Sequence, residues 1–108
     1  MKSYLVLIKG KGALDYSPEE LERRLAEYRA WVDTLGERHL GANRLENEGV
    51  HILKRGTMTT DGPFLEAKEI IAGYIILQAE SLQEAAQLAE TCPLLQYFEL
   101  FVRPMVGG

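Results

Sequence analysis

The helix-start pattern Ser-x-x-Glu occurs twice in this chain, and its two positions constrain the fold more than any other feature. Ser17 and Ser81 can each accept a hydrogen bond from an unpaired backbone N–H of a first helical turn. Glu20 and Glu84, three residues later, can reach back to the cap. Pro18 suits a first helical position because its missing donor costs nothing there. The pattern predicts one helix from residue 18 and a second from residue 82.

Apolar side chains at helical spacing extend both predicted helices. The first helix has an apolar face whose members recur at steps of four and three residues: Leu21, Leu25, Tyr28, Val32 and Leu35. Gly36 follows, and glycine is a common residue at the end of a helix. The second helix carries leucine and alanine to about residue 91, and Pro93 marks its end.

Four short apolar runs predict strands, at residues 2–9, 50–58, 73–79 and 97–103. Residues 37–48 are polar and irregular and are predicted to form a connection. The element order is therefore β-α-β-β-α-β. This order is typical of an α+β, ferredoxin-like fold with a four-stranded antiparallel sheet and two helices on one face. At 108 residues, we expect one domain over residues 1–108.

The predicted strands are apolar on both faces, which points to self-association. In the first strand, Tyr4, Val6 and Ile8 alternate with Leu5 and Leu7. Because the helices cover only one face of such a sheet, the other face would expose a large apolar surface. We therefore predict a homodimer in which two sheets pack face to face.

Composition excludes several classes of partner. The net charge is −4, and no run of lysine or arginine forms a basic stripe, so nucleic acid and anionic membranes are not expected partners. The first apolar run is too short for a signal peptide or a membrane span. Cys92 is the single cysteine and cannot form an intramolecular disulfide. These features favour a cytoplasmic protein.

The segment 61–69, Asp-Gly-Pro-Phe-Leu-Glu-Ala-Lys-Glu, is the main candidate for a functional site. It combines a rigid turn with four ionisable side chains, more than a simple connection needs. Asp61 could be a general base or a carboxylate that binds a polar ligand. The alternative is turn chemistry, because an aspartate before glycine often accepts hydrogen bonds from backbone N–H groups two residues on.

Other residues are predicted to join Asp61 in one pocket. Glu66 and Glu69 lie three residues apart and would share a face of a helical turn. With Asp61 they could hold a hard cation or divide into an acid and a base; the alternative is a solvated acidic face. We assign catalytic roles to Asp61 and Glu66, and we predict neither a metal site nor a cofactor. Ligand contacts are predicted from Phe64, Glu69, Tyr74, His51 and Arg44.

The string Asp-Gly-Pro-Phe-x-Glu-x-Lys-Glu at 61–69, followed by Gly73-Tyr74 and the terminal Val-Arg-Pro-Met at 102–105, resembles the YCII-related family, in its DGPF-type branch. The resemblance extends over nearly the whole chain and implies a dimeric α/β barrel. It also implies, for some members, a His–Asp pair with the histidine early in the first helix. Here that helix has no histidine, so only Asp61 of the pair is represented.

Two functions remain open from the sequence, and whether the chain is an enzyme is left undecided. The first is binding of a small polar molecule at the Asp-Gly-Pro-Phe turn, where the protein could also have a weak acid/base activity. The second is a dimeric interaction or regulatory module without catalysis. Its support is the apolar strand surface, together with the association of DGPF-type members with sigma factors that the resemblance implies.

Overall fold

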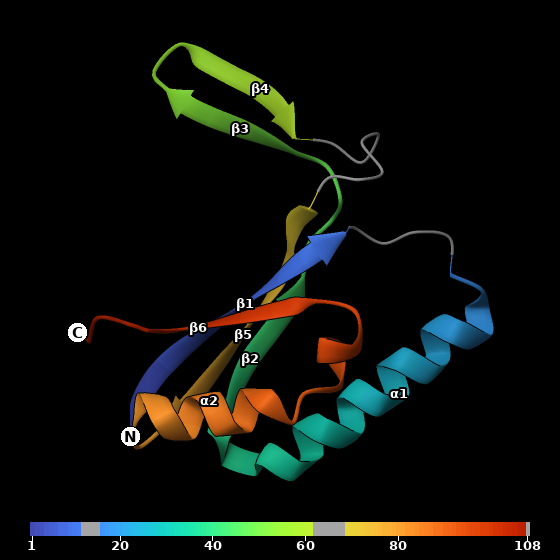
Figure 1. The fold of residues 1–108 in the computed structure, drawn as a ribbon, viewed down its shortest axis with the longest axis vertical. Coiled ribbons are helices and arrows are strands. Elements are labelled where there is room, and N and C mark those ends of the chain that lie inside the picture. Colours follow the sequence, from blue (N-terminus) through green and yellow to red (C-terminus); the bar gives the residue numbers. More distant parts are fainter. Residues whose placement is uncertain (12–15, 62–68, 108) are drawn as a thin grey trace.

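The fold is α+β, as predicted, and two helices pack against one four-stranded antiparallel sheet (Figure 1). The computed structural model describes residues 1–11, 16–61 and 69–107, with the backbone alone at residues 60 and 61. The sheet has the strand order β2-β5-β1-β6. Its strands are β1 (Lys2–Lys11), β2 (His39–Arg44), β5 (Glu69–Ala79) and β6 (Glu99–Pro104). A separate two-stranded sheet is formed by β3 (Gly49–Lys54) and β4 (Thr57–Asp61).

The two helices begin and end close to the predicted residues. Helix α1 (Pro18–Leu35) is capped by Ser17 Oγ, which accepts from the backbone N–H of Glu20 at 3.1 Å. It ends at Gly36, whose positive φ of 56° favours glycine. Helix α2 (Leu82–Glu90) begins in the same way at Ser81, with a cap bond of 3.1 Å. Two 3₁₀ turns, η1 (Gly36–Arg38) and η2 (Pro93–Gln96), follow the helices.

The hydrophobic core lies between the helices and one face of the sheet. Alternate residues of the two central strands point into it, as the period of two in a strand requires. From the strands the buried side chains are Tyr4, Val6, Ile8, Ile75, Leu77 and Ala79. The helices contribute Trp31, Leu35, Ala85 and Ala89.

The residues between these positions form the opposite face of the sheet, which we call the open face. Leu5 pairs across strands with Ile76, while Leu7 pairs with both Tyr74 and Phe101. These five side chains share one face because each pair lies directly opposite in the ladder. None of them belongs to the described core, and Phe101 is 45% exposed.

The identity of the second sheet strand differs from the prediction. Residues 39–44, expected to be irregular, form edge strand β2 and pair with β5. Residues 50–58, expected to form that strand, instead belong to the β3–β4 hairpin. Gly56, with φ of 87°, lies in the turn of this hairpin and divides the apolar run into two strands. The run predicted the strand conformation correctly but not its partner.

The strand that follows the segment 61–69 is longer than expected, since β5 begins at Glu69 rather than at residue 73. Its pairing with β1 contains an irregularity between Ile8 and Lys9. Gly73 lies beside this point and is buried against β2. A Cβ atom there would lie 2.7 Å from the backbone oxygen of Asn43, so the glycine permits a close approach of two backbones.

Candidate functional site

An open cleft of about 410 Å³ lies at the end of the sheet where the segment 61–69 joins β5. Its lining comes from the end of β1, the start of β5, and the chain from η2 to the first residue of β6. The lining residues are Lys9, Gly10, Lys11, Glu69, Leu95, Tyr97, Phe98 and Glu99. The cleft therefore joins three parts of the chain that are distant in sequence.

Strand register sets the charge pattern of the cleft. Lys9 of β1 is the cross-strand partner of Glu99, and Lys11 is the partner of Glu69. Within the described residues, none of these four side chains enters an ion pair, and the ion pairs found lie on α1 and between α2 and η1. Two ammonium groups and two carboxylates thus border the cleft, and the described side chains form no ion pair with one another there. A ligand with both acceptor and donor groups would find partners here.

Close packing of a glycine and an aromatic ring shapes one side of the cleft. A Cβ atom at Gly10 would lie 2.5 Å from Cδ1 of Phe98 and 3.3 Å from Cε1. The ring therefore occupies the space that any larger residue at position 10 would need. Phe98 also packs against the hydrophobic core, so the cleft wall is continuous with the folded interior.

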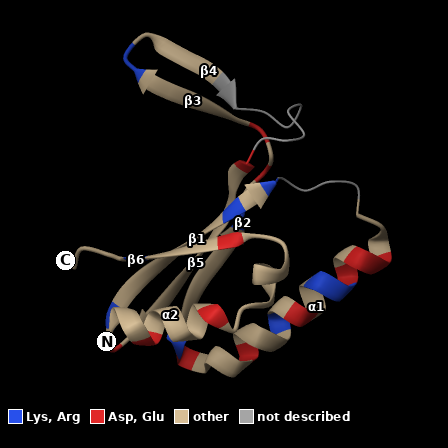
Figure 2. Ribbon diagram, in the orientation of Figure 1, with Lys and Arg blue, Asp and Glu red and all other residues tan. Residues whose placement is uncertain are grey.

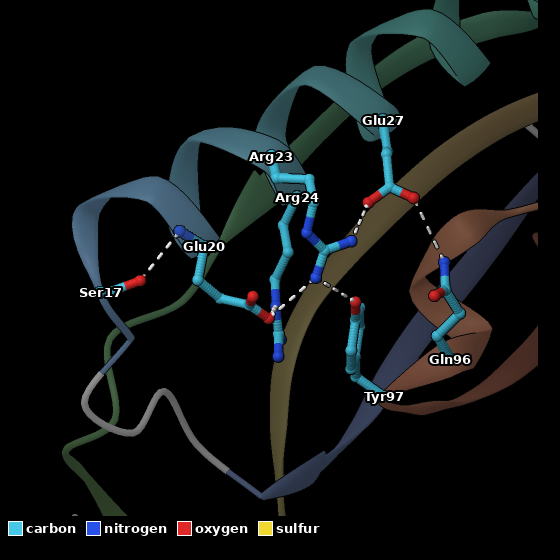
Figure 3. Close-up of polar contacts among 7 residues, drawn as sticks. All are labelled: Ser17, Glu20, Arg23, Arg24, Glu27, Gln96 and Tyr97. Atoms are coloured by element: carbon cyan, nitrogen blue, oxygen red, sulfur yellow. Dashed lines mark hydrogen bonds and ion pairs between the residues drawn. The ribbon is translucent and has the colours of Figure 1, made fainter.

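Tyr97 forms another wall, and two arginines of α1 hold it (Figure 3). Arg23 Nη2 donates to the Tyr97 hydroxyl oxygen at 3.2 Å. The Arg24 guanidinium stacks on the Tyr97 ring, 3.5 Å from its centroid, and lies 4.0 Å from the centroid of Tyr16. Arginine on an aromatic face is attracted by the negative ring face. The arginine between two tyrosines therefore fixes the ring that borders the cleft.

Carboxylates of the same helix orient these arginines (Figure 3). Glu20 Oε1 accepts from Arg23 Nη2 and from Arg24 Nε, both at 3.0 Å. Glu27 accepts from Arg23 Nη1 at 2.7 Å. Hydrogen bonds from Arg23 and then from Arg24 lower the pKa of Glu20 below its ordinary value. Exposed pairs of this kind are individually weak, so their role is to orient the arginines rather than to stabilise the fold.

The seven site residues predicted from the sequence do not all line the cleft, and some lie outside the described residues. Glu69 lines the cleft. Phe64 and Glu66 lie outside the described residues, and Asp61 ends strand β4 with only its backbone described. The structure leaves these three assignments untested.

The other three predicted ligand contacts do not line the cleft. Tyr74 lies on the open face, opposite Leu7. Arg44 is exposed at the end of β2 and pairs with Gly73. His51 is exposed on the hairpin. The described structure thus brings Glu69 to the cleft but does not bring Tyr74, Arg44 and His51 to it.

Several cleft residues were not identified from the sequence. Lys9, Lys11, Tyr97 and Glu99 carry no local motif, because strand register and not spacing along the chain brings them together. A signal for the arginine cluster does exist in the sequence. Acidic and basic residues alternate at intervals of three and four along α1, at positions 20, 23, 24 and 27, which places them on one helical face.

Two buried polar groups lie away from the cleft. Burial raises the pKa of Cys92 to about 11. Burial, and then the nearby Cys92, raises the pKa of Tyr28 to about 12. Both groups stay protonated at neutral pH, so neither is a thiolate or phenolate nucleophile there. Cys92 and Tyr28 are instead part of the core between α1 and the sheet.

No helix in the described ranges is long and apolar enough to cross a membrane. Among the side chains that the structure describes, no three from His, Cys, Asp and Glu come together in a group that could hold a metal ion. The candidate trio Asp61, Glu66 and Glu69 is not tested by this search, because only Glu69 has a described side chain.

Comparisons with known proteins agree with this architecture. A solved structure of 5-chloro-2-hydroxyhydroquinone dehydrochlorinase (TftG) from Burkholderia phenoliruptrix AC1100, in complex with 2,5-dihydroxybenzoquinone, aligns with a TM-score of 0.54. The alignment covers 98% of this chain and 95% of the dehydrochlorinase chain at 20% identity, which supports a shared fold. A search of curated protein sequences gives no significant match. The model of the YCII-related domain matches residues 3–106, so the chain belongs to the YCII-related family.

Proposed function

We propose that this protein binds a small polar molecule in the cleft at Glu69. The observation that carries the proposal is the convergence of Lys9, Lys11, Glu69 and Glu99 around a cleft at the point where the segment 61–69 enters the sheet. Polar groups that converge on a concave site are typical of ligand recognition. The carboxylates and ammonium groups favour a ligand that has both donor and acceptor groups.

The prearranged Tyr97 supports this proposal. Its ring is held by Arg24, and its hydroxyl by Arg23, before any ligand binds. A wall that is already fixed loses little conformational entropy when a ligand packs against it. The dehydrochlorinase of the same fold was solved with a small quinone, and this precedent also favours a small-molecule ligand.

The proposal includes an acid/base role for Asp61 and Glu66. Both belong to the segment that continues into Glu69, and α1 contains no histidine that could take the role. A carboxyl group in a partly desolvated cleft can have its pKa raised toward neutral pH. A pH–rate profile that is unaltered by Asp61→Asn and Glu66→Gln would exclude this role.

The binding proposal can be tested by a thermal-shift screen against polar metabolites and divalent metals. A ligand at 100 times its Kd raises the stability of the native state by about 2.7 kcal/mol. We expect at least one compound to stabilise the wild type, and we expect Glu69→Gln and Lys11→Gln to reduce that shift. Glu90→Gln is the matched control, because Glu90 is exposed at the end of α2 and does not line the cleft.

The outcomes show whether a ligand binds in the cleft or elsewhere on the molecule. A shift that survives in both Glu69→Gln and Lys11→Gln would place the ligand elsewhere and overturn the cleft as its site. A shift that is lost in Asp61→Asn as well as in Glu69→Gln would support a site that the segment 61–69 shares with the cleft. Failure of every compound to bind would favour the interaction function that follows.

A second function, an interaction module built on a homodimer, is favoured by the open face. Leu5, Leu7 and Phe101 lie on that face, and no described helix covers them. Contiguous exposed apolar surface in a protein commonly marks an interface. We propose that two copies pack these faces together, with light scattering across the micromolar range as the test. A monomeric mass throughout that range would exclude the homodimer.

A further inference from the structure

Helix α1 is joined to the hydrophobic core through its C-terminal half. Trp31 and Leu35 are the buried residues of the helix, and both lie in that half. In the N-terminal half, residues 18–27, Leu21 and Leu25 are half-buried, but neither is among the described side chains that form the core or pack against it. Figure 1 shows this end of the helix standing apart from the strands. The N-terminal half therefore has few apolar contacts with the rest of the fold.

Polar contacts instead join this half of α1 to η2 and to Tyr97, which lines the cleft (Figure 3). Arg23 donates to the Tyr97 hydroxyl, and the Arg24 guanidinium stacks on the Tyr97 ring. Gln96 Nε2 donates to Glu27 Oε2 at 3.5 Å. Only 17% of the Arg24 side chain is exposed, so water competes little with its stacking. One half of the helix is thus held mainly by groups at the cleft.

Few buried apolar contacts give a segment a low free energy of local opening. A helix shorter than about 12 residues is only marginally stable in water on its own, so the N-terminal half would lose its helical hydrogen bonds once detached. The same opening would take both arginines away from Tyr97. The ring would then lack its stacked cation, and its hydroxyl would lack the donor that orients it.

We propose that the N-terminal half of α1 opens separately from the rest of the fold, with Arg23 and Arg24 as the positioning residues that close it onto Tyr97. Closure fixes the Tyr97 wall of the cleft, and opening releases it. This inference rests on the proposed function, because the cleft is the proposed binding site. A ligand that contacts the fixed Tyr97 ring binds the closed form better, so its binding shifts the helix toward that form.

Hydrogen exchange of the unliganded protein tests the separate opening. In the wild type, we expect protection factors at residues 22–27 to be at least about tenfold lower than those at residues 31–35, which belong to the half joined to the core. Arg24→Met removes the stacked cation. We expect this variant to lower protection at residues 22–27 by at least about fivefold further, and to change it at residues 31–35 by less than about twofold.

Arg29→Met is the matched control. Arg29 is exposed on the same helix, and its replacement makes the same change in charge without touching the contacts to Tyr97. We expect it to leave protection at residues 22–27 within about twofold of the wild type, as is usual for a surface substitution. Tyr97→Leu tests the contact from its other side, and we expect it to lower protection at residues 22–27 as Arg24→Met does.

The Tyr97 ring also provides a spectroscopic signature that a general loss of stability would not produce. Isotope-labelled tyrosine gives a ring resonance for Tyr97 in NMR spectra, which is identified by its absence in Tyr97→Phe. We expect Arg24→Met to move this resonance toward that of a tyrosine in an unfolded peptide, because the ring loses its stacked guanidinium. We expect Arg29→Met to leave the resonance in place.

Several results would overturn the proposal. Equal protection of the two halves of α1 in the wild type would exclude separate opening. Unchanged protection at residues 22–27 in Arg24→Met, an equal loss in Arg29→Met, or an equal loss in both halves would exclude closure by Arg24. An unmoved Tyr97 resonance would exclude control of the cleft wall. Because no ligand is present, these failures would leave ligand binding in the cleft standing, whereas a ligand screen without a hit would remove the binding function and leave helix closure intact.

Discussion

Gly73→Ala tests the close contact between β5 and the edge strand β2. A Cβ atom at this position would lie 2.7 Å from the backbone oxygen of Asn43, roughly 0.8 Å nearer than the ~3.5 Å at which non-bonded heavy atoms attract each other best. The atom that must move belongs to the backbone, and it lies where Asn43 and Tyr74 pair. Relief therefore requires β2 to shift against β5 rather than one side chain to rotate.

Two opposing effects determine how much Gly73→Ala changes the free energy of unfolding. Overpacking of this kind costs about 1–3 kcal/mol. Replacing glycine by alanine also stabilises the folded protein by about 0.4–1 kcal/mol, because alanine lowers the conformational entropy of the unfolded chain. We therefore expect Gly73→Ala to lower the free energy of unfolding by about 1–2 kcal/mol. For a domain of this size, that corresponds to a fall in Tm of about 4–16 °C.

Gly41→Ala is the matched control in the strand that faces Gly73. Nothing lies within 4 Å of a Cβ atom at Gly41, and its φ is not positive. We expect this variant to melt at or slightly above the temperature of the wild type. Thermal and urea unfolding followed by circular dichroism, at one protein concentration, measure both variants. Gly73→Ala with a Tm equal to or above that of the wild type would refute the steric argument.

Four further predictions concern the core and the second helix. Trp31 Nε1–H donates to Thr91 Oγ1 at 2.8 Å, and Thr91→Val removes this acceptor. We therefore expect Thr91→Val to lower the free energy of unfolding by about 1–3 kcal/mol, as measured by urea unfolding. The Cys92 thiol, with a pKa raised to about 11 by burial, should react with a disulfide reagent at pH 8 at least about a hundredfold more slowly in native than in unfolded protein. Its raised pKa also makes stability fall as pH rises from about 9 to about 11, because the unfolded state loses the proton first. Glu84 has a pKa lowered by the backbone N–H of Glu80, so its contribution is present above pH 4.5 and is lost as pH falls through the lowered pKa. The difference between the urea midpoints of Glu84→Gln and the wild type should therefore shrink steadily as pH falls below 4.5.

Helix positions could be predicted from the sequence because local interactions determine them. The Ser17 and Ser81 caps and the stop at Gly36 depend on residues within one turn of each other. No distant contact is needed to recognise them. The predicted boundaries of α1 and α2 therefore agree with the structure to within about a residue, the usual uncertainty of such boundaries.

Strand partners could not be predicted in the same way. Strand β2 contains Gly41 and Asn43, residue types that are depleted in strands, and most of its side chains are exposed. It forms a strand because β5 offers it a hydrogen-bonding edge. The apolar run in residues 50–58 has a stronger strand preference, but preference does not specify a partner. That run pairs with itself around Gly56 instead.

The candidate site could be predicted only in part from the sequence, for a similar reason. The segment 61–69 is conspicuous because its ionisable residues are adjacent along the chain. Glu69 is its one member with a described side chain, and it lines the cleft. The register of β1 and β6 places Lys9 opposite Glu99, and the register of β1 and β5 places Lys11 opposite Glu69. No single-segment motif contains that information.

Strand β1 relates the cleft to the proposed dimer. Leu5 and Leu7 point to the open face, and Lys9 and Lys11 continue the same alternation beyond them. The open face thus changes from apolar to charged along β1, whereas β6 carries Phe101 between the charged residues Glu99 and Arg103 on the same face. Pairing two sheets through the apolar part leaves the charged end at the margin, because burying the lysines would require full charge compensation. The cleft would then open at the edge of the dimer, where solvent and a small ligand can reach it.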